Sequence, residues 1–181
     1  IFTNNDSGYE TAIEFKKNGV VPIILDTRKD PKSEIINEAK NLDIEIKFSY
    51  VVVAAKGYKK VKAAEIAKIS ENKNELGLLE SIDCDCICVS GFWTPTIHLA
   101  SQSGNKTKFN KDIDAFVPGL SKQNETTLGA ANGTFTLEET LRNSFDAGYK
   151  LSKKITNNDN KVLFPAVVEK KSTQHDKFWC V

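Results

Sequence analysis

The sequence predicts an α/β fold, with a Rossmann-like sheet in three layers and a small antiparallel β meander. Apolar spacing over the first 48 residues follows the order strand, helix, strand, helix, strand, which is half of a doubly wound sheet. Residues 50–69 then carry two β-rich runs around a Lys-Gly turn, as a hairpin would. A turn of small residues at 129–133 precedes a long amphipathic helix.

The first five elements are predicted from apolar periodicity and from signals at their ends. Asn18-Gly19 ends the first helix, and Pro31 suits the first position of the second. Pro22 falls within the second apolar run, where its missing N–H indicates that no neighbouring strand needs a donor. The predicted elements are strands at residues 1–3, 20–25 and 44–48, and helices at residues 6–17 and 31–42.

The turn Thr3–Gly8, between the first strand and the first helix, has the place of the dinucleotide fingerprint G-x-G-x-x-G. Only Gly8 remains of the three glycines, while Asp26 stands where the acid that binds a ribose belongs. Asn5 or Asp6 could instead cap the helix. The loss of two glycines favours a structural turn over a working dinucleotide cradle, and both interpretations stay open.

The next stretch is predicted to be rich in strands. The run at residues 61–69 completes the hairpin, although its alanines also fit a helix. Residues 71–79 are predicted to form a polar turn. Residues 84–89 are predicted to form a strand that is central to the sheet, because they alternate and end on valine.

Three of the four cysteines alternate along this last segment, at Cys84, Cys86 and Cys88. On a strand they would share one face, which raises the possibility of a thiolate metal site. A row of side chains along one strand cannot enclose a tetrahedral ion, and no C-x-x-C or histidine pair completes a ligand set. We therefore predict buried packing, no metal, and reduced thiols in a cytoplasmic protein, with Cys180 remote.

The segment from Gly129 to Glu139 follows a predicted strand end and forms a candidate binding turn. Thr136 and Glu139 make a T-x-x-E capping box, and the following helix has apolar residues spaced for one buried face. A turn with few side chains lets a ligand approach the backbone, and a helix N-terminus favours an anion such as phosphate. The alternative is an ordinary capped helix after a tight turn.

Composition limits the classes of function. The 181 residues are 40% hydrophobic and 27% charged, with a formal net charge of +1. This balance is typical of globular proteins and argues against a nucleic-acid partner. No apolar run could span a bilayer, so no membrane role is predicted. Because the chain starts on the apolar Ile1 without a leader and ends on an apolar run, we expect a piece of a longer chain.

Four collinear segments carry a resemblance to a known family. Ser90-Gly91-Phe92-Trp93-Thr94-Pro95 resembles the linker segment of two-domain flavin and pyridine-nucleotide reductases. More specifically, the chain resembles the alpha subunit of bacterial heterotetrameric sarcosine oxidase. The matching segments are Thr3–Ser7, Val89–Pro95 with His98–Gly104, Ala115–Gly119 and Gly129–Gly133.

This resemblance implies an FAD/NAD(P)-binding fold and three regions. Residues 1–110 would be the second, NAD-domain-like nucleotide-binding domain, residues 111–156 the returning segment of the first, and residues 157–181 a linker toward a folate-binding C-terminal half. The implied partners are the preceding and following domains of the subunit and the beta, gamma and delta subunits. The implied cofactors are NAD in the subunit, and FAD and FMN in or beside a partner subunit.

The resemblance also implies which residues approach the cofactor. The segment from residue 129 to residue 137 would close over NAD that is held mainly by the preceding domain. The predicted cofactor-binding residues are Gly129, Ala130, Ala131, Gly133, Phe135, Thr136 and Leu137, with Asn5, Asp6, Asp26, Gly91 and Pro95 as weaker candidates.

No residue of this chain is predicted to be catalytic. His98 lies near Ser101 and Ser103, but no G-x-S-x-G elbow accompanies it, so a structural or interface role is favoured. The resemblance implies one of two functions: completing the NAD site and packing subunits in a sarcosine-oxidising flavoenzyme, or serving as a non-catalytic nucleotide-binding scaffold of a related amine oxidoreductase.

Overall fold

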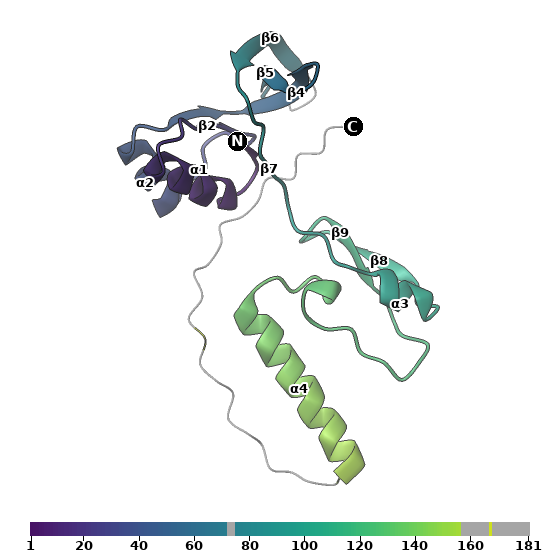
Figure 1. Ribbon diagram of the computed structural model, residues 1–181. Coiled ribbons are helices and arrows are strands. Elements are labelled where there is room, and N and C mark those ends of the chain that lie inside the picture. Colours follow the sequence, from purple (N-terminus) through teal and green to yellow (C-terminus); the bar gives the residue numbers. More distant parts are fainter. Residues whose placement is uncertain (72–74, 157–166, 168–181) are drawn as a thin grey trace. The chain divides into compact units, whose positions relative to one another are not determined.

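A computed structural model describes residues 1–71, 75–156 and 167 (Figure 1). These residues form two compact units that divide between Phe92 and Trp93. The linker predicted at residues 157–181 lies outside the described residues, apart from Val167. No helix in the described part of the chain is long and apolar enough to cross a membrane.

The first unit is built on a parallel sheet whose strands follow the order β3-β2-β1-β7. Every neighbouring pair in this sheet is parallel. Two helices, α1 (Ser7–Lys17) and α2 (Glu34–Asn41), connect the first three strands, as in a doubly wound fold. The strands are β1 (Phe2–Thr3), β2 (Ile23–Asp26), β3 (Glu45–Phe48) and β7 (Val89–Ser90).

Consecutive residues of β2 point to opposite faces of the sheet and enter two different cores. Ile24 is fully buried in the core under the helices, together with Tyr9 of α1 and Ile36 of α2. Leu25 enters a second core, with Ala64 and Ile66 of the next sheet. Helices therefore cover one face of the parallel sheet, and an antiparallel sheet covers the other (Figure 1).

The antiparallel sheet is a meander of β4 (Tyr50–Gly57), β5 (Val61–Ile69) and β6 (Leu76–Asp83). The strand prediction for residues 61–69 is correct, and their helical alternative is not formed. The predicted fold class is confirmed, since the unit has three layers, a Rossmann-like parallel sheet and a small antiparallel meander.

Several predicted boundaries are wrong. The polar turn predicted at residues 71–79 gives way to β6 from Leu76, which pairs with β5 along an exposed edge. The strand predicted at residues 84–89 is reduced to Val89–Ser90, and β7 lies at the end of the sheet order rather than at its centre. The second strand begins at Ile23, after Pro22, and α2 begins at Glu34 rather than at Pro31.

The second unit contains a two-stranded hairpin and a long helix. Ala115–Pro118 (β9) pairs antiparallel with Thr107–Asn110 (β8). The 3₁₀ turn η1 (Gly129–Asn132) lies against β9 and precedes α4. The remaining elements are α3 (His98–Gln102) and α4 (Leu137–Thr156). No strand forms at Thr127-Leu128, where a strand end was predicted.

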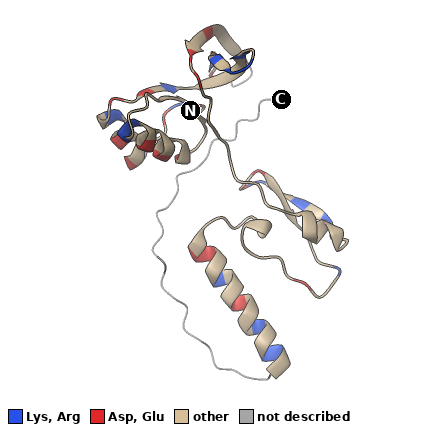
Figure 2. Ribbon diagram, in the orientation of Figure 1, with Lys and Arg blue, Asp and Glu red and all other residues tan. Residues whose placement is uncertain are grey.

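The helix α4 begins directly after Thr136, as predicted, but the prediction of a buried face is wrong. None of its 20 residues is buried within the described structure. Leu141 is 37% exposed and Leu151 59% exposed, although both lie on the apolar side. Acidic and basic side chains are interspersed along α4 (Figure 2), and no residue on the apolar side of this amphipathic helix is buried by the described part of the chain.

Candidate functional site

The carboxyl ends of β1, β2 and β7 meet at one edge of the parallel sheet, where ligands bind in open α/β folds. These strands end at Thr3, Asp26 and Ser90. The turn Asn4–Asp6 leads from β1 into α1 at the same edge. The structure therefore brings together four of the weaker candidates, Asn5, Asp6, Asp26 and Gly91.

Asn5 fills the turn with its own hydrogen bonds. Its side-chain oxygen accepts from the backbone N–H of Ser7 (2.9 Å) and from the Ser7 hydroxyl (2.7 Å). Its amide nitrogen donates to the carbonyls of Gly91 (2.8 Å) and Ser90 (3.3 Å). A pyrophosphate would use N–H groups of this first helical turn, and here Asn5 occupies the one at Ser7.

Gly8 keeps one of the three functions of the fingerprint glycines, the close packing of helix on strand. A Cβ atom at this position would lie 2.6 Å from Cβ of Thr3 and 2.7 Å from its hydroxyl. Gly8 is buried at the start of α1. The surviving glycine is thus explained by packing between α1 and β1.

Asp26 lies at the centre of a buried polar cluster. Its Oδ2 accepts from the hydroxyl of Tyr9 (2.6 Å) and from Arg28 Nη2 (2.8 Å), and its Oδ1 accepts from the backbone N–H of Arg28 (2.9 Å). Arg28 Nη1 also donates to Asp6 Oδ1 (2.9 Å). Asp26 and Tyr9 are both 0% exposed, so the carboxylate that could bind a ribose is occupied by protein groups here.

The cluster raises the pKa of two of its members, Tyr9 and Arg28. Burial and the hydrogen bond to Asp26 raise the pKa of Tyr9, which keeps the phenol neutral. Burial alone would lower the pKa of Arg28, but the hydrogen bonds and charges of Asp26 and Asp6 outweigh it and raise that pKa. Two carboxylates therefore share one guanidinium beneath the sheet edge.

The main predicted binding segment lies in the second unit, at its surface. Ala130 and Leu137 are exposed, and Ala131, Phe135 and Thr136 are half-buried. Gly129 is buried, but the rest of the segment is not enclosed in the core of its own unit, and its outer side chains can be reached by a ligand.

The two glycines of this segment have backbone and packing reasons to be glycine. Gly129 and Gly133 adopt φ angles of 65° and 81°, which favour glycine. A Cβ at Gly133 would lie 2.6 Å from Ile113 and 3.0 Å from Val117, so the turn sits tightly on the hairpin. Pro95, 3.7 Å from the same point, is buried in this unit.

The predicted capping box differs in its bonding. The hydroxyl of Thr136 donates to the carboxylate of Glu139 (3.0 Å), whereas the predicted box pairs each side chain with a backbone N–H. The backbone carbonyl of Thr136 accepts from the N–H of Thr140 (3.0 Å), which starts the helix. Thr136 thus marks the helix start without closing a full box.

The remaining candidates are placed as follows. His98 is exposed at the start of α3. The predicted core packing of the cysteines holds for Cys84, which lies half-buried against a core cluster, and is wrong for the exposed Cys86. Cys86 is exposed, while Cys84 and Cys88 are half-buried, and all three are free thiols. Among the described residues, no group of three or more potential ligands could hold a metal ion.

Sequence reasoning missed Tyr9, Arg28 and Ser90. Arg28 follows Asp26 by two residues, and this spacing is the only local signal of the pair. Tyr9 and Ser90 join the site through contacts over 17 and 85 residues of sequence, which a local pattern does not contain.

Comparison with curated proteins identifies relatives of one kind. The sarcosine oxidase alpha subunit of Rhizobium meliloti strain 1021 is 33% identical over 142 residues, which is 74% of this chain. The alpha subunit of Corynebacterium sp. strain P-1 is 29% identical over 143 residues, or 78% of this chain. The predicted resemblance is confirmed. The chain spans 13–15% of the length of these relatives.

Solved structures confirm the fold. Thioredoxin reductase of T. acidophilum matches with a TM-score of 0.50 and 16% identity over 72% of this chain and 46% of its own. Bacillithiol disulfide reductase of Staphylococcus aureus matches with a TM-score of 0.53 and 16% identity over 74% and 46%. No family model matches the chain.

Proposed function

The chain is similar over 74–78% of its length to one segment of sarcosine oxidase alpha subunits, and from this premise we propose that it completes a dinucleotide site in a subunit of that kind. In this proposal the chain is the nucleotide-handling part of a flavin-dependent oxidoreductase. The ligand is NAD, most of which is held by other parts of the subunit.

One observation carries the proposal: residues 129–133 form a turn of small residues, exposed at Ala130 and Asn132, and three residues later the chain enters a 20-residue helix. The backbone of this turn can be approached closely, because Ala130 is exposed and neighbouring positions are small. The first N–H groups of α4 and its positive dipole end favour an anion beside this turn, while Glu138 and Glu139 in the same helical turn compensate part of that positive end. Ala130, Phe135 and Leu137 are the proposed contacts to the dinucleotide.

The edge of the first unit has a structural role in this proposal. The side chain of Asn5 accepts a hydrogen bond from the N–H of Ser7, and Tyr9 and Arg28 donate hydrogen bonds to the carboxylate of Asp26. A dinucleotide at this edge would have to displace these bonds, at about 1–3 kcal/mol for each buried group left without a partner. In this proposal the sheet edge of the first unit keeps the nucleotide-binding fold, and the pyrophosphate is bound by another part of the subunit.

Isothermal titration calorimetry of the purified chain with NAD, and separately with FAD, tests the proposal. We expect no binding, or binding weaker than millimolar, since the chain supplies only one side of the site. Micromolar affinity for NAD would overturn it.

A chimera tests the site within a whole subunit. The chain replaces the matching segment of the Rhizobium meliloti alpha subunit, and bound NAD is measured after purification. The Ala130→Glu variant should lose NAD, because its carboxylate would repel the pyrophosphate. The Gln102→Glu variant adds the same charge on exposed α3 and should retain it. Equal NAD content in both variants would contradict the assignment.

A second function is favoured by the occupied edge of the first unit. Here the chain is a non-catalytic scaffold, in which a nucleotide only stabilises the packing of domains and of the beta, gamma and delta subunits. FAD and FMN would then lie in or beside the partner subunit that oxidises the amine. In the chimera, sarcosine oxidation that survives Ala130→Glu together with loss of NAD would favour this function over the first.

A further inference from the structure

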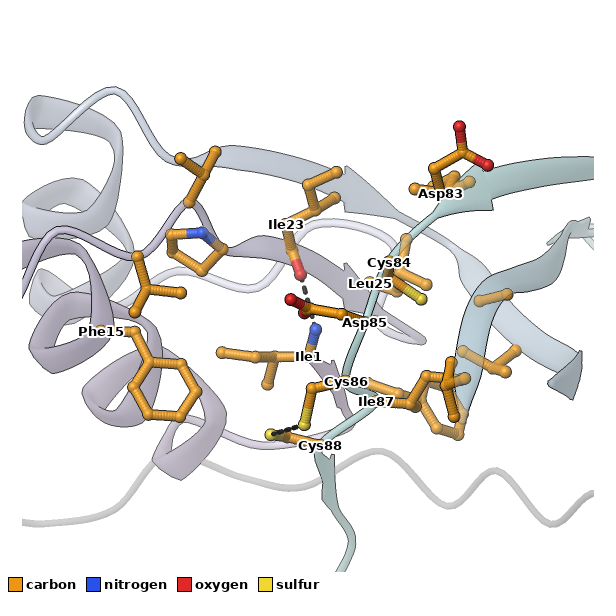
Figure 3. A pocket seen from close by; sticks show the side chains of 18 of the residues that line it. Ile1, Phe15, Ile23, Leu25, Asp83, Cys84, Asp85, Cys86, Ile87 and Cys88 are labelled. Carbon is orange, nitrogen blue, oxygen red and sulfur yellow. Dashed lines mark hydrogen bonds between the residues drawn. The ribbon is translucent and has the colours of Figure 1, made fainter. Parts of the chain in front are cut away.

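Cys86 and Cys88 bring their thiols into contact in the stretch between β6 and β7. Their Sγ atoms lie 3.8 Å apart (Figure 3). Side chains two residues apart on an extended strand repeat at about 6.6–6.8 Å, so this contact needs a backbone that departs from a strand. Residues 84–88 have no strand pairing and supply that backbone.

The stretch is fixed at both ends by backbone hydrogen bonds. The N–H of Cys84 donates to the carbonyl of Lys62 (3.0 Å), and the N–H of Phe2 donates to the carbonyl of Cys88 (2.8 Å). Between these anchors the chain makes a short irregular path. The fold therefore holds the two thiols near each other at little further entropic cost.

The pair is accessible to small molecules. Cys86 is exposed and Cys88 half-buried, and both line a cavity of about 760 Å³ (Figure 3). Phe15, Val21 and Ile23 contribute apolar side chains to the same cavity. This cavity lies by the amino ends of β1 and β2, and the candidate nucleotide edge is at their carboxyl ends.

Cys84 differs from the other two thiols. It packs against the core formed by Leu25, Ala64 and Ile66. Neither Cys86 nor Cys88 packs against that core, and this difference makes Cys84 an internal control.

We propose that Cys86 and Cys88 form a reversible dithiol–disulfide site that reacts with low-molecular-weight disulfides. The thiolate of Cys86 attacks one sulfur of the small disulfide, which forms a mixed disulfide and releases one small thiol. The thiolate of Cys88 then attacks the sulfur of Cys86, and the second small thiol leaves. The protein loses two electrons and two protons, and the small disulfide takes them up as two thiols.

The order of attack follows from the environment. Burial, followed by the hydrogen bond with Cys86, raises the pKa of Cys88. Cys88 therefore keeps its proton longer and acts second, as the resolving thiol. The exposed Cys86 is the first nucleophile.

Oxidised glutathione is the probe for the test, applied to the full 181-residue chain in a Cys180→Ser background that leaves the three thiols of interest. Intact mass and tandem mass spectrometry of the alkylated peptides record the products. We expect the background chain and its Cys84→Ser variant to lose two hydrogens through a Cys86–Cys88 bond that dithiothreitol reverses. Cys86→Ser and Cys88→Ser should form no internal disulfide and at most a mixed one.

Other outcomes overturn the proposal. A disulfide that includes Cys84, or one that survives either the Cys86→Ser or the Cys88→Ser variant, would assign the chemistry elsewhere. A mixed disulfide as the sole product in the background chain would show that Cys88 does not resolve it. An equal rate of closure in denaturant would show that the fold does not bring the thiols together. Cys88→Ala is the second variant if Cys88→Ser does not fold.

Discussion

In the first unit, α1 buries Tyr9, Ala12 and Ile13 against the parallel sheet, whereas α4 of the second unit has 20 residues and buries none of them. The first helix spans only 11 residues. Length and amphipathicity therefore do not decide how much a helix contributes to the stability of its unit. The difference lies in whether the described chain provides a surface for the apolar side.

The polar groups of the two units show the same contrast. Arg28 in the first unit pairs with Asp26 and Asp6, and these charges are largely withdrawn from water. The pair between Arg142 and Glu138 on α4 is short, at 2.6 Å, but exposed on both sides. A buried cluster is costly to break, while an exposed pair contributes little. We expect substitutions to have large effects in the first unit and small ones on α4.

The largest effect is expected for Arg28→Met. It leaves the carboxylates of Asp26 and Asp6 without their shared cation, which should lower the free energy of unfolding by about 3–5 kcal/mol. Urea denaturation followed by circular dichroism measures the loss. Lys29→Met is the control, because Lys29 pairs with Glu71 in full exposure and its loss should leave the midpoint unchanged. Equal shifts of the urea midpoint in both variants would contradict the expected difference between the buried and the exposed ion pair.

The same glycine substitution should have opposite signs in the two units. Gly8→Ala places a Cβ 2.6 Å from Thr3, and the overpacking should cost about 1–3 kcal/mol. Gly148 of α4 has nothing within 4 Å of the added Cβ, so Gly148→Ala should stabilise the helix by about 0.5–1 kcal/mol. Thermal unfolding of both variants gives the comparison. Destabilisation by Gly148→Ala would indicate that another surface covers this side of α4.

Tyr9→Phe should cost about 1 kcal/mol at neutral pH, because it removes a hydrogen bond to Asp26. The cost should shrink at alkaline pH. Tyr9 has a pKa raised above its ordinary value of 10.0, so above about pH 10 the unfolded phenol ionises while the folded one keeps its proton. Wild-type stability then falls as pH rises, and the variant lacks this component. Urea midpoints from pH 7 to 11 would contradict this if the difference stayed constant.

The smallest effect is expected for Leu151→Ala. Its side chain is 59% exposed, so the loss should lie within about 0.5 kcal/mol. The matched change in a buried helix position, Ile36→Ala, should cost about 2–5 kcal/mol, because Ile36 is 1% exposed. Chemical denaturation of the two variants side by side measures the ratio. A comparable loss at Leu151 would mean that the apolar side of α4 is covered in solution.

Sequence periodicity predicted most of the first unit because its helices and strands bury one face each. Tyr9, Ala12 and Ile13 repeat at helical spacing, and Ile24 with Leu25 enters two cores. The strand β6 was missed because Leu78 and Leu79 are both exposed, which gives an edge strand no alternating burial pattern. Its position follows from pairing with β5, a contact that the local sequence does not encode.

The sequence predicted where the candidate site residues lie in the fold, but not which groups they form hydrogen bonds with. The place of Asp26 at the end of the second strand follows from the fold pattern, but its bond to Tyr9 depends on the three-dimensional meeting of α1 and β2. Periodicity also predicted a buried apolar side for α4, whereas none of its residues is buried in the described part of the chain. Whether anything covers that side is a property of the surrounding chain, and one helix does not carry this information.

The contact between Gly8 and Thr3 has a consequence for redesign. A phosphate grip could be rebuilt by removing side chains at Thr3 and Asn5, the positions where the backbone must turn and come near a ligand. Position 8 needs no change, since spacing between helix and strand already demands the smallest residue there. The last glycine of such a fingerprint therefore indicates only close packing of helix on strand. The two glycines before it are the ones that indicate a bound nucleotide.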